Sequence, residues 1–257
     1  MFAHLPIIDI PLLDTSILLF LVFIALLTGF VKSGLPALGG LVSVMLVSVF
    51  PAKDALGITL FYLLAGDVIA VTFYWRQVNV VELKRLLPMI FVGIGTGILV
   101  LSVVNDQLLG LVIGSMIIFL VLLEPFRTTV SAWAMRHIVW IRNISGWLAG
   151  LTTTVGNAAG PILSLYFLLL KLDKHSFTGT AAVFFLIVNT VKLPLYGSIG
   201  IFKAYYLSSV LLTVPFVFVG AYFGRQFLKW IPQQQFTQII LAFTGLAGLS
   251  LIIRYFI

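Results

Sequence analysis

The 257-residue chain has no cysteine and few charged residues, and each shortage excludes a class of protein. Without cysteine it forms no disulfide, holds no cysteine-ligated metal and performs no thiol catalysis. Charged residues make up 9% of the chain. A soluble domain usually carries about 25%, because fewer charges do not coat a globular surface in water. The composition therefore excludes an ordinary soluble protein.

Motifs of several enzyme classes are also missing. The chain has no HExxH, no GxSxG and no P-loop, so an intramembrane protease, a hydrolase and a self-contained ATPase lack their parts. His4, His137 and His175 are scattered, without the spacing of a zinc site. We therefore expect a protein that is not an enzyme, has no catalytic residues and needs no metal or other cofactor.

What the chain does contain is long hydrophobic runs. Hydrophobic residues make up 61% of it, and the mean hydropathy is +1.18. The runs 17–31 and 112–123 contain no ionisable side chain. In hydrocarbon the backbone must satisfy its own hydrogen bonds, so such runs fold as helices, and the alternation typical of a membrane barrel is absent. The sequence predicts an all-α polytopic membrane protein without a cleavable signal peptide, because the first Lys or Arg, Lys32, follows the first apolar run.

The apolar runs divide into about ten segments. They are 16–31, 35–50, 55–75, 86–104, 108–123, 143–156, 157–170, 176–196, 205–225 and 236–256. Segments 1–2 and 6–7 have only about 14–16 residues each, whereas a span takes about 20. We expect each to be a short tilted span or half of a re-entrant hairpin. The rival interpretation has eight spans, in which 16–50 and 143–170 each cross once as a broken helix.

The basic residues favour ten segments with both termini outside. The cytoplasmic residues are then Lys32, Arg76, Lys84, Arg85, Arg127, Arg136, Arg142, Lys171, Lys174, Arg225 and Lys229. Only Lys53, Lys203 and Arg254 are external, and Lys192 lies within a segment. Eight spans give a weaker bias and leave Lys32 inside the membrane. Since the net charge of +7 reflects these connections, we expect no nucleic-acid partner.

The two halves of the chain resemble each other. At an offset of 121, Gly29, Gly39 and Lys53 match Gly150, Gly160 and Lys174; at 122, Gly57, Asp67 and Tyr74 match Gly179, Asn189 and Tyr196; and Pro88-x4-Gly93-x3-Gly97 matches Pro215-x4-Gly220-x3-Gly224. This predicts a first transmembrane repeat at 1–123, a cytoplasmic connection at 124–142 and a second repeat at 143–257. Because five segments is an odd number, the second repeat is inverted. Such repeats with interrupted segments are typical of secondary transporters, whose substrate site lies between the repeats.

The first interruption, at 32–40, is rich in hydrogen-bond donors. Pro36 removes a helical donor, and Gly34, Gly39 and Gly40 let the chain turn, so a helix that restarts here points free N–H groups into the break. These groups and the positive end of the helix dipole suit an anion. Ser33 adds a hydroxyl. Lys32 either adds a charge or faces the cytoplasm as a topology determinant.

The second interruption, at 152–161, offers further donors and no acidic residue. Its candidates for substrate binding are Thr153, Thr154, Gly156 and Asn157. Hydroxyls within a membrane often bond to carbonyls of their own helix instead, which would account for one or two of the threonines.

Three further polar residues lie within long apolar segments. Asp67 is an intramembrane carboxylate, which is costly and therefore a candidate to carry a coupling proton. Asn189 occupies the matching repeat position, and Lys192 follows it by three residues on the same helix face. Lys192 either attracts the substrate anion or neutralises Asp67.

The glycine-rich break, the stretch Ala55-Leu56-Gly57-Ile58-Thr59-Leu60 and the duplicated second half resemble the TauE/SafE family of sulfite and organosulfonate exporters. The resemblance extends from about Gly29 to Ile252. It implies a multi-pass protein of the bacterial inner membrane that exports a small anion such as sulfite or sulfoacetate by alternating access. Its expected partners are that anion, the lipid bilayer, protons as coupling ions and a second copy of the chain in a homodimer. The alternatives are an anion channel and the membrane subunit of a larger permease.

Overall fold

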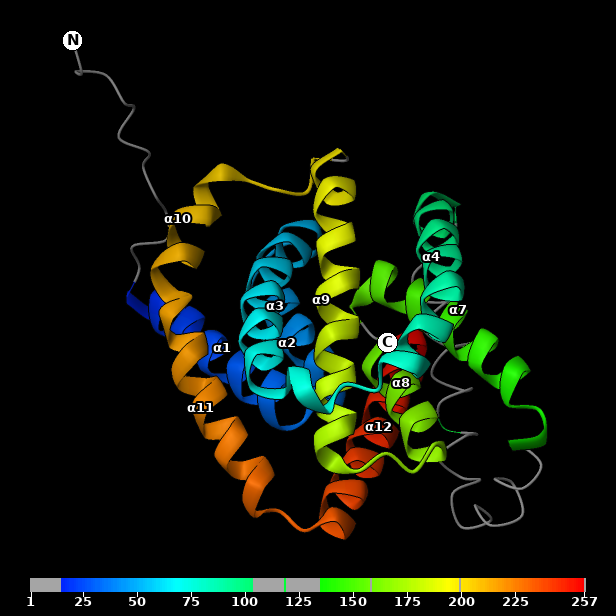
Figure 1. The fold of residues 1–257 in the computed structure, drawn as a ribbon. Helices are drawn as coiled ribbons and strands as arrows, with labels where there is room; N and C mark the ends of the chain where they lie inside the picture. The colour runs from blue at the N-terminus through cyan, green and yellow to red at the C-terminus, as the bar shows by residue number, and fades with distance from the viewer. Residues whose placement is uncertain (1–14, 104–117, 119–134, 158, 199, 257) are drawn as a thin grey trace, which may run out of the picture.

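The computed structural model describes residues 15–103, 118, 135–157, 159–198 and 200–256, and the elements within these ranges are helices (Figure 1). They are α1 (Thr15–Gly34), η2 (Pro36–Leu38), α2 (Gly39–Val47), α3 (Ala52–Tyr74), η3 (Trp75–Gln77), α4 (Val80–Val103), α7 (Ile138–Gly156), α8 (Ala159–Leu169), α9 (Lys174–Ser198), α10 (Ala204–Thr213), α11 (Pro215–Trp230) and α12 (Gln233–Phe256). The segment predicted at 108–123 and most of the connection at 124–142 lie outside the described residues.

Several helices have the length and composition of membrane spans. Thr15–Gly34, Asp54–Gln77 and Lys174–Ser198 are long and apolar enough to cross a bilayer. Tyr206–Thr213 and Pro215–Trp230, bent by 43° at Val214, make a fourth if they form one broken span. Large apolar side chains also lie exposed on the outside, such as Leu99 at 68% and Phe218 at 62%. The prediction of a helical membrane protein is confirmed, whereas the total of ten segments stays a prediction.

The predicted short segments differ from the helices in an informative way. The first and sixth are longer than predicted, because α1 has 20 residues and α7 has 19, whereas α2 has 9 and α8 has 11. α1 continues through Lys32 because the Lys32 side chain forms an ion pair with Asp67 inside the fold. α7 begins at Ile138, within the stretch predicted as a connection. At about 1.5 Å per residue, α2 and α8 fall well short of the roughly 30 Å hydrocarbon core.

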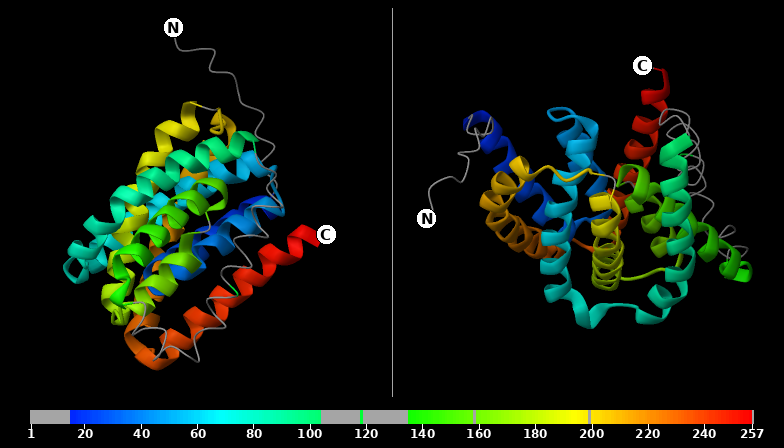
Figure 2. Two further views of the ribbon diagram at one scale, coloured as in Figure 1. Left: turned by 90° about the vertical axis from the view of Figure 1, so that its right-hand side faces the viewer. Right: turned by 90° about the horizontal axis from the view of Figure 1, so that it is seen from above.

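Three helix pairs organise the molecule. α1 packs along α11, α4 along α7 and α3 along α9, and Figure 2 shows the α3–α9 pair between the other two when the molecule is viewed from above. Glycines make the outer contacts close. A Cβ on Gly29 would collide with the backbone of Val217, and one on Gly93 with that of Trp147. Both glycine pairs, Gly93/Gly97 and Gly220/Gly224, lie at such close helix contacts.

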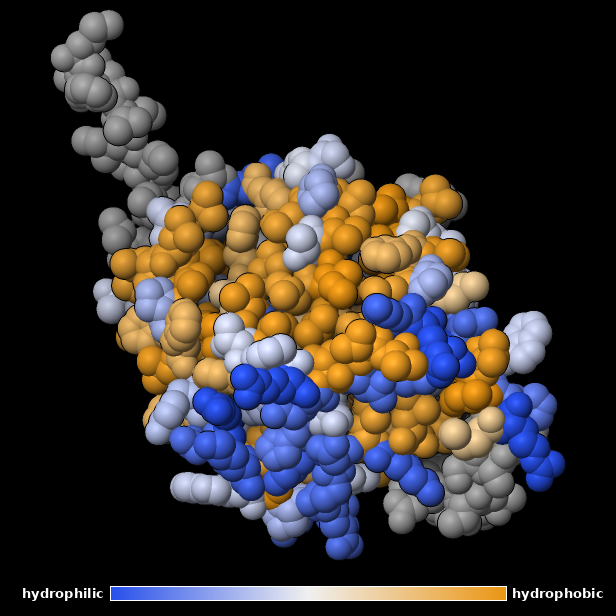
Figure 3. Space-filling view, viewed as in Figure 1, coloured by the Kyte–Doolittle hydropathy of each residue, from blue (hydrophilic) through white to orange (hydrophobic). Residues whose placement is uncertain are grey.

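Hydrophilic residues gather towards one end of the molecule, which is the lower end in Figure 3. There Lys174 Nζ donates to the carbonyl oxygens of Lys229 at 3.2 Å and Ile231 at 2.5 Å, and Arg225 lies over the ring of Phe73. These basic residues, at the start of α9 and the end of α11, were predicted to share one side of the membrane. They share one end of the fold, and its assignment to the cytoplasm stays a prediction.

Candidate functional site

The first break lies between α1 and α2 and depends on Pro36. The N–H of Leu35 donates to Val31 O at 2.8 Å and completes α1, after which Leu35 turns out of the helix with φ of −138°. Pro36 then opens the 3-10 turn η2, where its missing N–H costs nothing. Gly39 caps this turn and begins α2. The interruption predicted at 32–40 is therefore present, and it falls after Gly34.

The second break lies between α7 and α8 and depends on an asparagine. Asn157 adopts the left-handed conformation with φ of 55°, and its N–H donates to Thr152 O and Thr153 O. Asparagine tolerates this region better than most residues because its short side chain bonds locally. The sequence indicated Asn157 only as a hydrogen-bond donor for the substrate, without a role in the turn. In the fold, Asn157 ends α7, and Gly160 serves a packing contact instead.

The two breaks meet each other. A Cβ on Gly160 would lie 2.6 Å from Ala37 O, and one on Gly40 would lie 3.8 Å from Asn157 O. By contrast, a Cβ on Gly39 would meet nothing within 4 Å. α2 and α8 thus both begin close to the place where the two breaks pack against each other. There is open space beside Gly39.

Buried polar side chains from both halves of the chain form a cluster beside the crossing. Lys32 Nζ lies 2.6 Å from Asp67 Oδ1, and Asn189 Nδ2 donates to Asp67 Oδ2 at 2.7 Å. Lys192 Nζ donates to Asn189 Oδ1 at 3.3 Å and to Asn157 Oδ1. We call Lys32, Asp67, Asn157, Asn189 and Lys192 the central cluster. None of the five is more than 4% exposed, so the cluster is closed to solvent in this conformation.

Lys32 and Lys192 have different partners within the central cluster. Lys32 pairs with the carboxylate of Asp67, and its ammonium also lies 4.0 Å from the ring centroid of Phe185. Lys32 is therefore a buried residue, and its interpretation as a cytoplasmic topology determinant is wrong. Lys192 donates to two amide oxygens, so it does not form the direct ion pair with Asp67; Lys32 forms that pair.

Two buried polar atoms, one in the central cluster and one on the residue that follows Lys32, lack a partner within the described part of the chain. Ser33 Oγ and Asn157 Nδ2 are buried and make no hydrogen bond there. Both can donate. Because Asn157 Oδ1 accepts from Lys192, its amide group lies next to a cation.

Two tyrosines that sequence reasoning did not assign to the site brace the breaks. The Tyr74 hydroxyl donates to Ser33 O at 2.8 Å, and the Tyr196 hydroxyl donates to Thr154 O at 3.2 Å. Their matched repeat positions were the one available signal. Gly66 also belongs here, because a Cβ would lie 2.8 Å from Lys32 Cγ and hinder that side chain on its way to Asp67.

The remaining candidates have structural roles or lie outside the cluster's bonding. Thr152 and Thr154 donate to Leu148 O and Gly150 O of their own helix, as the alternative interpretation of the threonines expected. Thr153 is buried beside them. Gly34 packs against Gly224, where a Cβ would lie 3.0 Å from its carbonyl oxygen. Gly156 is the last residue of α7.

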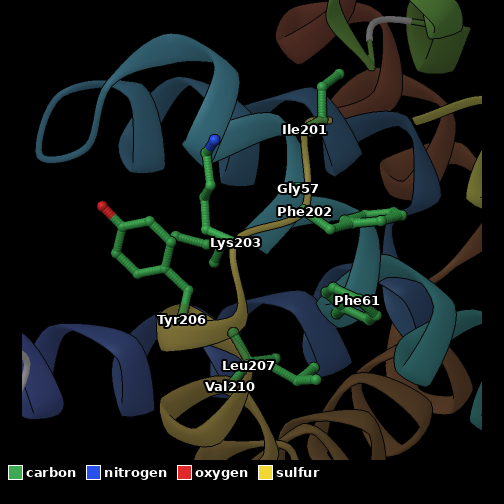
Figure 4. Close-up of a pocket in the computed structure, with 9 residues that line it drawn as sticks. Gly57, Phe61, Ile201, Phe202, Lys203, Tyr206, Leu207 and Val210 are labelled. Atoms are coloured by element: carbon green, nitrogen blue, oxygen red, sulfur yellow. The ribbon is translucent and has the colours of Figure 1, made fainter. Parts of the chain in front are cut away.

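A separate pocket lies beside the N-terminal part of α3, near the start of α10. Figure 4 shows Phe61, Phe202 and Tyr206 around it, with Lys203 at the side. Tyr206 also donates to Asp54 Oδ2 at 3.3 Å. This pocket shares no residue with the central cluster. Within the described ranges, no group of three or more His, Asp or Glu residues is placed to hold a metal ion.

Comparison with known proteins identifies the family. The model of the sulfite exporter TauE/SafE family matches residues 21–251, which is most of the chain. No curated protein and no solved structure matched the chain. A family of exporters agrees with the expectation of a transporter rather than an enzyme. The chain belongs to the sulfite exporter TauE/SafE family.

Proposed function

We propose that this protein is a secondary transporter that exports a small sulfur-containing or organic anion, such as sulfite or sulfoacetate, by alternating access. The observation that carries the proposal is the central cluster. It places two lysines and one aspartate, fully buried, at the junction of two broken helices. Charged groups inside a membrane protein are costly and mark a pathway for substrate or ions.

The anion is held by one cation that has no carboxylate partner and by two donors that have no acceptor within the described part of the chain. Lys192 supplies a positive charge, and Ser33 Oγ and Asn157 Nδ2 supply buried donors. The N-termini of α2 and α8 add the positive ends of two helix dipoles. Broken helices that point their N-termini at an anionic group are typical of transporter sites.

Alternating access between two inverted repeats is supported by contacts that recur in both halves. Gly29 packs on Val217, and Gly150 packs on Ile90. Gly29 and Gly150 are 121 positions apart, and Ile90 and Val217 are 127 apart. Likewise Gly220 packs on Leu26 and Gly93 on Trp147, which are again pairs at offsets of 127 and 121.

The tyrosine braces follow the same relation. Tyr74 donates to Ser33 O and Tyr196 donates to Thr154 O, while the offsets are 122 for the tyrosines and 121 for their acceptors. Asp67 and Asn189, which match at 122, bond to each other. Matched residues that touch lie on the axis relating two repeats. We therefore place the transport site on that axis.

Release of the substrate requires movement, because the central cluster is closed to solvent. In the proposed repeats, α1 belongs to the first and α11 to the second, and α4 and α7 likewise come from opposite repeats. Rocking at these two glycine contacts opens the cluster to one side at a time. Asp67 as proton carrier and a homodimeric assembly stay predictions; loss of the pH dependence of transport in Asp67→Asn tests the former, and the mass of the purified protein in detergent tests the latter.

The basic end of the fold faces the cytoplasm in this proposal, with both termini outside a bacterial inner membrane. An inside-negative potential then drives anions outward, by roughly 2.3 kcal/mol per charge per 100 mV. Export of an anion is downhill electrically, so the direction of transport needs little help from coupled protons.

Counterflow in proteoliposomes tests the proposal. Vesicles loaded with unlabelled sulfite should accumulate labelled sulfite transiently, and ohmic current without exchange would establish a channel instead. Transport by the purified chain alone excludes dependence on a larger permease. Asn157→Leu should abolish exchange. Thr190→Leu is the matched control, because Thr190 is exposed on α9 beside Asn189 and bonds only to Leu186 O of its own helix.

A further inference from the structure

The central cluster carries an unequal number of opposite charges. Among the described residues, the fully buried charged side chains are Lys32, Lys192 and Asp67. In their ordinary ionised forms, two lysines and one aspartate carry one net positive charge. Asn157 and Asn189 are neutral amides and do not alter this count.

The excess charge resides on Lys192. Lys32 and Asp67 form an ion pair, and the second oxygen of Asp67 is occupied by Asn189. Lys192 has only amide oxygens as partners within the cluster, and these solvate the ammonium without neutralising it. An uncompensated charge away from water is costly, and an anion bound beside it removes that cost.

We propose that the site selects monovalent anions, such as hydrogensulfite and simple sulfonates, over divalent ones of the same shape. This inference rests on the proposed function and ranks its candidate substrates, with hydrogensulfite above the sulfoacetate dianion. One negative charge brings the buried site to neutrality. A second negative charge leaves the loaded site with an unpaired anion in a medium of low dielectric constant.

Two ligands of nearly equal shape separate charge from size. Sulfoacetamide carries one negative charge, and sulfoacetate carries two because a carboxylate replaces the amide. Calorimetric titration of the purified full-length protein in detergent should show sulfoacetamide binding at least about tenfold tighter, a difference of about 1.4 kcal/mol. Equal affinity, or tighter binding of sulfoacetate, overturns the inference.

Three variants move the charge of the site. Lys192→Gln brings the empty site to neutrality and should weaken sulfoacetamide binding at least about tenfold. Asp67→Asn, almost isosteric, raises the site to two positive charges and should reverse the preference towards sulfoacetate. The double variant Lys32→Gln/Asp67→Asn restores a single positive charge and should again prefer sulfoacetamide, which keeps the test valid if Asp67→Asn alone misfolds.

The outcomes distinguish this inference from the function beneath it. If wild-type protein binds neither anion and exchanges no sulfite in counterflow, both the proposed function and this inference are refuted. If the protein exchanges sulfite but its preference ignores the charge of ligand and variant, the function stands and selection by charge is refuted. A preference that follows the charge through all three variants establishes the inference.

Discussion

The two halves of the chain bring different chemistry to one centre. The first half contributes Lys32 and Asp67, which satisfy each other as an ion pair. The second contributes Asn157, Asn189 and Lys192, in which amide oxygens hold an ammonium that has no carboxylate of its own. The charges of Lys32 and Asp67 in the first half thus cancel, whereas the second half contributes the charge of Lys192, which no carboxylate pairs with.

This difference coexists with closely matched backbone packing. Gly29 and Gly150 occupy corresponding crossings, and Tyr74 and Tyr196 brace corresponding carbonyls. The repeated contacts form a similar framework in both halves, whereas the side chains at the centre differ between the halves. Substitutions at matched positions should therefore have similar effects in the framework and different effects in the cluster.

The largest difference is expected between Lys32 and Lys192. Lys32→Met leaves the Asp67 carboxylate buried without its cation, and should lower the free energy of unfolding by about 3–5 kcal/mol. Lys192→Met leaves two neutral amide oxygens without a donor but also removes a buried charge that no carboxylate pairs with, and should cost about 1 kcal/mol or less. Denaturant titration of each variant in detergent micelles, followed by circular dichroism, measures both values.

A double variant checks the cause. Lys32→Met/Asp67→Leu removes both charges of the pair, and should recover most of the stability lost in Lys32→Met, because apolar replacements of buried ion pairs are often neutral. Equal costs for the two single lysine variants, or no recovery in the double variant, contradict this account of the cluster.

Similar losses are expected at the matched glycines. In Gly29→Ala the new Cβ collides with Val217 O, and in Gly150→Ala with Ile90 O. Each should cost roughly 1–3 kcal/mol by overpacking. Thermal unfolding of the two variants compares them, with Gly39→Ala as control because its Cβ meets nothing within 4 Å. A loss at one glycine without the other would mean that the two crossings are not equivalent.

Much of this framework could be predicted from the sequence, because a bilayer leaves few options. Hydrophobic runs located the helices, and the matches between the two halves included the glycines that lie at the close crossings. The ends of α1 and α7 could not be predicted in this way. α1 continues because Lys32 finds Asp67 inside the fold, and a basic residue after an apolar run otherwise marks the membrane surface.

Which residues belong to the central cluster was also easier to predict than which of them bond to each other. Asp67, Asn189 and Lys192 were recognised as polar residues within apolar segments, and Asn157 as a donor in the second interruption. Which lysine meets Asp67 depends on how α1 lies against α3, which no local pattern encodes. Tyr74 was recognised only as the repeat match of Tyr196, whereas in the fold it is buried and bonds to the first break.

The tyrosine braces should show a smaller and graded effect. Tyr74→Phe and Tyr196→Phe each remove one hydrogen bond to a buried carbonyl, and should cost about 1 kcal/mol. The loss should be larger for Tyr74, since its bond is 2.8 Å long against 3.2 Å for Tyr196. Melting temperatures of the two variants measure the order. The reverse order would show that bond length does not govern these braces.

The smallest expected effect is a difference in how the stability of the two breaks responds to glycine and alanine. Asn157 has a φ of 55°, so Asn157→Gly should be more stable than Asn157→Ala by about 1 kcal/mol, because a Cβ is disfavoured in the left-handed region. Leu35 has a φ of −138°, which any residue adopts, so Leu35→Gly should be less stable than Leu35→Ala by roughly 0.5–1 kcal/mol. Paired thermal melts give the two signs. If the Gly-minus-Ala stability differences at Asn157 and Leu35 have opposite signs, the second break depends on the conformational tolerance of Asn157 and the first on Pro36. The two halves then form similar breaks by different means. Differences of equal sign would contradict this distinction.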